Sequence, residues 1–135
     1  MIRLVLLSPN GVLFDEDVLS FTVQSKKGPL QINGGYTPIF EMVEEASVLK
    51  IDTGKKKIYY AIFHSSLRVT PMKALLSCTH CEEGYDIDTA RANESKIRAE
   101  KRLERKEEGV DVARAKASLA RALIRLEVKS LSEGH

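Results

Sequence analysis

The last third of the sequence, from Ile87 to about Lys129, is charged and rich in alanine, glutamate, lysine and arginine. These residues are strong helix formers. A single break at residues 108–111 divides the segment into two halves. Because Gly109 favours the end of a helix and Asp111 can cap the next one, the pattern predicts a helical hairpin.

Residues 1–84 instead show the pattern of short β-strands. Turn residues such as Gly28-Pro29 and Asn33-Gly34-Gly35 separate the apolar runs. We expect strands at 2–7, 12–14, 19–24, 30–32, 47–53, 57–63, 67–69 and 73–78. Many short strands at close spacing are typical of an antiparallel sandwich or flattened barrel. The sequence therefore predicts an α+β protein, with a β-sandwich domain at 1–84 and a helical hairpin at 85–135.

The charge balance excludes some classes of function. The 135 residues carry a net charge of +2. Basic and acidic residues number nine and nine up to residue 84, and twelve and ten after it, so no basic arm exists for nucleic acid. Pro9 ends the first apolar run before it reaches the length of a signal sequence, and no stretch is long enough to span a bilayer. We expect a cytoplasmic protein without membrane insertion.

The two expected helices differ in their apolar surface. The first has little beyond Ile97, Ala99 and Leu103, and either Asp86 or Asp88 can cap it. The second carries a regular apolar series: Val112, Ala115, Leu119, Ala122 and Leu126, with Leu123 beside it. We expect the alanines to let the helices approach closely, and the first helix to be weakly held and free to move.

Arginines recur along one face of each helix. They are Arg91, Arg98, Arg102 and Arg105 in the first helix, and Arg114, Arg121 and Arg125 in the second. A compact hairpin would bring some of them together, and guanidinium groups suit bidentate contacts with phosphate. From spacing alone, the favoured alternative is two solvated faces with pairs such as Glu94–Arg98.

The motif Cys78-Thr79-His80-Cys81 is a weak indication of metal or redox chemistry. Zinc needs three or four ligands, and only His64 and His135 remain as distant candidates. A thioredoxin-type site would need a βαβ setting rather than a series of strands. We therefore favour reduced, structural thiols and expect no metal site.

No group of residues indicates catalysis. Ser65 follows His64, but neighbours in a strand point to opposite faces. The stretch Gly28–Gly35 is not a phosphate loop, because no Lys-Ser/Thr follows it and no helix opens after it. We expect no catalytic residues, and an enzyme is the least favoured class.

The motif Ile87-Asp88-x-x-Arg91-Ala92 resembles the I/L-D-x-x-R-A nucleotide-binding motif of the epsilon subunit of bacterial F-type ATP synthases. The resemblance covers nearly the whole chain, a β-sandwich followed by a helical hairpin. An ungapped alignment on the motif places four more residues on family positions that contact ATP. The resemblance thus implies an ATP-binding set of Glu82, Ile87, Asp88, Arg91, Ala92, Arg98, Arg121 and Arg125. It reverses the preference for solvated arginine faces.

Other segments support the same alignment. Gly28–Pro38 is similar to the family stretch G-E-x-G-I-L-P-G-H-A-P, and Asp111–Ala115 resembles the D-x-x-R-A opening of its second helix. Ala61–Val69 resembles the strand A-V-S-G-G-x-x-x-V, although Phe63-His64-Ser65 replaces Ser-Gly-Gly. Pro29, Gln31, Asn33, Gly34 and Tyr36 also differ from the family, in the region where its sandwich meets the rotor ring and the gamma subunit.

The resemblance implies a non-catalytic regulatory subunit in the central stalk of a proton-translocating rotary ATP synthase, peripheral on the cytoplasmic side of the cell membrane. Its sandwich would bind the gamma subunit and the c ring. Its hairpin, when extended, would reach the alpha/beta catalytic hexamer and block ATP hydrolysis. ATP, as a regulatory ligand rather than a cofactor, would stabilise the folded hairpin. The rival interpretations are a structural adaptor that binds a helical partner without sensing nucleotide and, less favoured, a redox or metal protein using Cys78 and Cys81.

Overall fold

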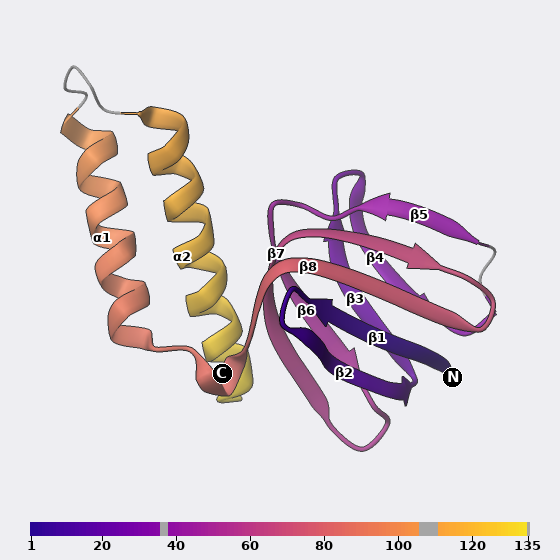
Figure 1. Cartoon of the computed structure of the whole chain (residues 1–135). Coiled ribbons are helices and arrows are strands. Elements are labelled where there is room, and N and C mark those ends of the chain that lie inside the picture. The colour runs from indigo at the N-terminus through magenta and orange to yellow at the C-terminus, as the bar shows by residue number, and fades with distance from the viewer. Residues whose placement is uncertain (36–37, 106–110, 135) are drawn as a thin grey trace.

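The computed structural model describes residues 1–35, 38–105 and 111–134, and shows an eight-stranded sheet followed by two packed helices (Figure 1). The elements in chain order are β1 Ile2–Ser8, β2 Gly11–Val18, β3 Ser20–Ser25, β4 Gly28–Asn33, β5 Ile39–Met42, β6 Ala46–Asp52, β7 Lys57–Val69, β8 Lys73–Glu83, the 3-10 turn η1 Gly84–Asp86, α1 Thr89–Arg105 and α2 Val112–Ser132. This order confirms the α+β class and the helical hairpin. The strand β5 was not predicted.

The strands form one sheet in the order β2-β1-β8-β7-β6-β3-β4, with β5 paired to β7. All pairs are antiparallel except β1 with β8, in which Arg3 lies beside Lys73 and Leu7 beside Ser77. The sheet is therefore mixed, whereas the spacing of the strands predicted a purely antiparallel one. It wraps round into the expected flattened barrel (Figure 1).

The inner faces of the strands enclose an apolar core. Along β6, Leu49 and Ile51 are fully buried in that core, and the alternating residues Ala46 and Val48 face the opposite side. The core also contains residues from both ends of the sheet, such as Val18 of β2 and Ile32 of β4. This period-two alternation gives the sheet two apolar faces at β6 and β7, one for the core and one for the helices.

A bend at His64 divides β7 between two partners. Residues before the bend pair with β6 and residues after it pair with β5. His64 has a φ of 50°, in the left-handed region, and its N–H donates to the carbonyl of Glu45 at 2.9 Å. Histidine tolerates this region better than most side chains do. The two separate strands predicted at 57–63 and 67–69 are therefore one bent strand.

Aspartates cap both helices. Asp88 Oδ1 accepts a hydrogen bond from the backbone N–H of Arg91 at 3.2 Å, and Asp111 Oδ1 accepts one from Arg114 at 3.0 Å. Each bond satisfies a donor that a helix start leaves unpaired. Asp88 rather than Asp86 is the cap of α1. The helix break predicted at Gly109 lies outside the described residues.

The two helices pack through alanines. Ala92 and Ala99 of α1 are buried, as are Ala115 and Ala122 of α2, and each pair is spaced seven residues apart. Small side chains at this spacing let two helices approach along one seam. Ile97, expected among the apolar contacts of α1, is instead 50% exposed. The packing of α1 against α2 thus involves few large apolar side chains.

The helix α2 lies between α1 and the sheet (Figure 1). We name its contact with the sheet the docking cluster: Ala61, Phe63, Ile87 and Val128, all buried, with Ala46, Val48, Tyr59 and Ile124 against them. Lys129 Nζ also donates to the carbonyl of Tyr85 at 3.2 Å. In the described ranges, neither helix is long and apolar enough to cross a membrane.

Candidate functional site

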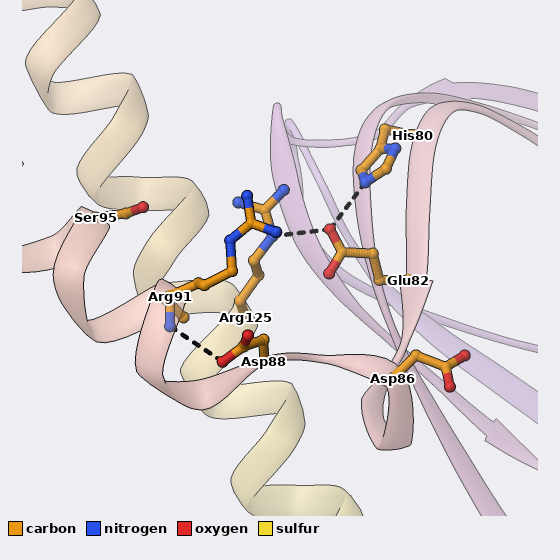
Figure 2. A pocket seen from close by; sticks show the side chains of 8 residues that line it. His80, Glu82, Asp86, Asp88, Arg91, Ser95 and Arg125 are labelled. Carbon is orange, nitrogen blue, oxygen red and sulfur yellow. Dashed lines mark hydrogen bonds and ion pairs between the residues drawn. The ribbon is translucent and has the colours of Figure 1, made fainter.

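A hollow of about 460 Å³ opens where the end of β8, the start of α1 and the middle of α2 meet (Figure 2). Its volume falls within the range of small-molecule sites. Its lining is polar: His80, Glu82, Asp86, Asp88, Arg91, Ala92, Ser95 and Arg125. The segment from His80 to Ser95 and the more distant Arg125 therefore contribute to one site.

Glu82 connects the sheet to α2. Its Oε1 accepts from Arg125 Nε at 3.0 Å and contacts His80 Nε2 at 2.8 Å. Both contacts use the same oxygen, so Oε2 makes no such contact with these two residues. A carboxylate in this position can accept further hydrogen bonds from a ligand.

Arg125 is held on two sides. Its guanidinium carbon lies 4.7 Å from the centre of the Phe63 ring, and its Nε bonds to Glu82. Phe63 itself is buried in the docking cluster. The side chains of Arg91 and Arg125 extend from the two helices into the same space, opposite Glu82 (Figure 2). The stacking and the ion pair together place a cation at the junction of helix and sheet.

A second, smaller hollow of about 100 Å³ lies between the helices. It is lined by Ser95, Arg98, Ala99, Arg102, Ser118, Arg121 and Arg125. It shares Ser95 and Arg125 with the first hollow, so the two adjoin. No carboxylate is among the residues that line this second hollow in the described ranges.

Most of these arginines lack an acidic partner. Within the described part of the chain, Arg125 with Glu82 is the only ion pair made by an arginine of either hollow. Arg121 donates a hydrogen bond to the hydroxyl of Ser118 at 3.2 Å. The ion pair expected between Glu94 and Arg98, both of which are described, does not form. A groove with several unpaired cations has a positive potential and attracts anions.

The structure brings together seven of the eight residues expected to bind ATP. Five of them line the first hollow: Glu82, Asp88, Arg91, Ala92 and Arg125. Arg98 and Arg121 line the second. Ile87 is the exception, because its side chain is 3% exposed and packs in the docking cluster. Whether this set binds ATP stays a prediction.

Several lining residues are not among those expected to bind ATP. They are His80, Asp86 and Ser95 in the first hollow and Ala99, Arg102 and Ser118 in the second. Arg102 was noted only as part of an arginine face, and His80 only as part of the cysteine motif. The sequence does contain a signal for His80. It lies two residues before Glu82, and residues two apart in a strand lie on the same face.

The two cysteines of β8 contact the sandwich core rather than the first hollow. Cys78 is buried in the sandwich core and Cys81 packs against that core, and both are free thiols. A hydrogen bond from Cys78 to Cys81 raises the pKa of Cys78, with burial adding to the effect, and lowers the pKa of Cys81. Across the described ranges, no group of three or more His, Cys, Asp or Glu residues is arranged to hold a metal ion.

Sequence comparisons point to one family. Residues 86–130 match the model of the ATP synthase Delta/Epsilon chain, long alpha-helix domain. The ATP synthase epsilon chain of Bacillus cytotoxicus is 33% identical over 126 residues, which cover 93% of this chain and 94% of that protein. The epsilon chain of Natranaerobius thermophilus is also 33% identical, over 93% of this chain and 89% of that protein.

Solved structures share the fold. A chain of the Euglena gracilis mitochondrial ATP synthase, from a structure of its OSCP, F1 and c-ring, aligns with a TM-score of 0.73 at 18% identity, covering 98% of this chain and 79% of that one. A chain from the central stalk and c-ring of the Tetrahymena thermophila enzyme aligns with a TM-score of 0.60 at 10% identity, covering 95% and 96%. At these identities the likeness concerns the fold alone.

Proposed function

The chain belongs to the family of ATP synthase epsilon chains, which are non-catalytic subunits of that enzyme, and we propose that its helical hairpin senses ATP and regulates ATP hydrolysis. ATP binds in the two adjoining hollows while the hairpin is folded on the sheet. When ATP is scarce, the hairpin leaves the sheet, extends toward the alpha/beta catalytic hexamer and blocks hydrolysis. The observation that carries the proposal is the set of arginines on two facing helices that meet at Arg125.

The charges support a phosphate ligand. Arg98, Arg102 and Arg121 have no carboxylate partner in the described part of the chain, and they face a narrow space between the helices. Guanidinium groups repel one another there unless an anion lies among them. A triphosphate supplies that anion and accepts bidentate hydrogen bonds from each guanidinium group.

The position of the site supports a switch. Its residues come from β8, α1 and α2, so the hollow exists only while α2 lies against the sheet. A ligand shifts a conformational equilibrium by its difference in affinity for the two states. ATP that binds only the folded hairpin stabilises it by about 2.7 kcal/mol at a concentration of one hundred times Kd.

The partners follow from the family. We propose that the sandwich binds the gamma subunit and the c ring in the central stalk, and that the protein is peripheral on the cytoplasmic side of the membrane that holds the enzyme. Related folds in solved ATP synthases come from assemblies that contain a c-ring. Crosslinking of the full chain within an assembled ATP synthase would identify the subunits that the sandwich contacts.

One observation favours a second candidate, a structural adaptor that does not sense nucleotide. The docking cluster buries Phe63, Ile87 and Val128 through contacts between protein side chains. Burial of such side chains stabilises a contact by about 1.5–3 kcal/mol each. The hairpin of an adaptor would stay folded whether or not ATP is bound.

Titration of the isolated chain with ATP separates the two candidates. Calorimetry without Mg²⁺ measures binding, and a fluorescent pair on α2 and the sheet, in a variant with Cys78 and Cys81 replaced, reports the hairpin. We expect saturable binding together with a larger folded fraction. Binding with an unchanged hairpin would favour the adaptor, and absence of binding up to cellular ATP concentrations would refute the sensing role.

A further inference from the structure

His80 has an unusual position in the first hollow. Among the described residues that line it, His80 carries the only aromatic ring. One face of the imidazole lies on Phe63, with ring centres 5.9 Å apart and planes inclined by 25°. Its Nε2 contacts Glu82 at 2.8 Å, yet the side chain is 57% exposed. The ring is thus fixed on one face and one edge and open on the other face.

Among the described lining residues, the acidic ones all lie in the first hollow. Glu82, Asp86 and Asp88 line it together with Arg91 and Arg125, whereas the charged residues around the second hollow are all arginines. Carboxylates repel phosphates and guanidinium groups attract them, so the second hollow favours phosphates more than the first does. A nucleotide bound with its phosphates between the helices has its base near Glu82, which places the base beside His80.

We propose that His80 is a further binding residue of this site, whose open face stacks on the nucleobase. The inference rests on the proposed ATP-binding function and adds to it a subsite for a planar aromatic ring. Stacking of a base on an aromatic side chain is tolerant of which base is present. Phe63 stacks on the opposite face of the His80 ring, and the hydrogen bond to Glu82 sets the orientation of that ring.

A different role for His80 would be to position Glu82 without touching the ligand. Two substitutions separate these roles. His80→Gln keeps a polar group that reaches Glu82 but removes the ring. His80→Tyr keeps an aromatic face but loses the imidazole nitrogen. Stacking requires the ring, and positioning of Glu82 requires the nitrogen donor.

The experiment is calorimetry of ATP and of inorganic tripolyphosphate binding to the full chain and to both variants. Stacking predicts that His80→Gln weakens ATP binding about tenfold. It predicts that His80→Tyr stays within about twofold of the parent protein, and that the affinity for tripolyphosphate is the same in all three. Thermal unfolding of each variant identifies any that does not fold, and His80→Phe then takes the place of a misfolded His80→Tyr.

Three results would overturn the stacking role while leaving ATP binding intact. They are parent-like ATP affinity in His80→Gln, equal weakening in His80→Tyr and His80→Gln, and weakened tripolyphosphate binding in His80→Gln. A parent protein that binds neither ATP nor tripolyphosphate would instead overturn the proposed function, and the stacking role with it.

Discussion

At the scale of single residues, the arginines of the site are held in different ways. Arg125 bonds to Glu82 and lies over Phe63, so it also connects α2 to the sheet. Among the described residues, the side chain of Arg121 makes one hydrogen bond, to Ser118 on its own helix. Loss of Arg125 is therefore expected to change both ATP binding and the docking of α2 on the sheet. Loss of Arg121 tests the proposed phosphate contact without disturbing that docking.

We predict that Arg121→Ala weakens ATP binding by about tenfold to a hundredfold, because a charge-assisted hydrogen bond is lost. The matched control is Arg105→Ala at the end of α1, which lines neither hollow. Calorimetry at two salt concentrations measures the effect, and added salt should reduce the difference. Equal affinities for the two variants would exclude a phosphate contact at Arg121.

Most of the site residues, but not their surroundings, are predictable from the sequence. The arginines and Glu82 were predicted from a family motif and its spacing, and the structure brings them together. Ile87 belongs to the same motif, but its side chain faces the docking cluster. Spacing along the chain does not say which side of a turn faces a ligand. His80 was missed because β8 was expected to end at Cys78, whereas it continues to Glu83.

At the scale of elements, α2 uses two faces. Ala115 and Ala122 are buried at the contact with α1, whereas Ile124 and Val128 pack on the sheet. The spacing of apolar residues in the sequence predicted the face toward α1 but not the face toward the sheet. Leu123, expected on the apolar side, is 45% exposed. A helix between two partners has no single polar face, so one period cannot describe it.

The sheet was predictable in its strands but not in its pairing. Local apolar runs and turn residues predicted seven of the strand positions, but β5 has only four residues, and its sequence does not alternate between apolar and polar residues. The parallel contact of β1 with β8 joins segments about 70 residues apart in the sequence. Such a contact is determined by the folding of the whole sheet rather than by local residues.

Gly84 holds the close contact between η1 and the end of α2. A Cβ atom at this position would lie 2.6 Å from the Cβ of Ser132 and 3.2 Å from the carbonyl oxygen of Val128. We predict that Gly84→Ala pushes this end of α2 off the sheet and speeds amide hydrogen exchange in α2. Hydrogen exchange followed by mass spectrometry measures the change.

The double variant Gly84→Ala with Ser132→Gly is the control for this contact. It removes the obstructing side chain, so we expect it to restore most of the protection in α2, with Ser132→Gly alone as the reference. If Gly84→Ala leaves the exchange of α2 unchanged, the close approach at Gly84 does not hold the hairpin.

At the scale of the whole molecule, the apolar contacts fall into two groups of unequal size. The sandwich core consists entirely of residues between Ile2 and Cys81. The docking cluster is smaller and adds only Ile87, Ile124 and Val128 from the segment after the sheet. We therefore propose that residues 1–84 and 85–135 are separate domains, the first stable and the second mobile.

A fragment of residues 1–84 tests this division. We predict that it unfolds cooperatively and has a β-type circular dichroism spectrum, because its core remains complete. We also expect it to bind the gamma subunit. Phe63 and Val48 would become exposed in it, so some loss of solubility is expected. A disordered fragment would show that the hairpin belongs to the folding unit.

The proposed regulation requires that the folded hairpin permits ATP hydrolysis and that the released hairpin blocks it. The measurement is ATP hydrolysis by an assembled ATP synthase that carries a disulfide between α2 and β6, with Cys78 and Cys81 of its epsilon subunit replaced. We predict that oxidation raises ATP hydrolysis at low ATP, with synthesis retained, and that reduction reverses the effect. Hydrolysis that is unchanged when the crosslink is complete would contradict it.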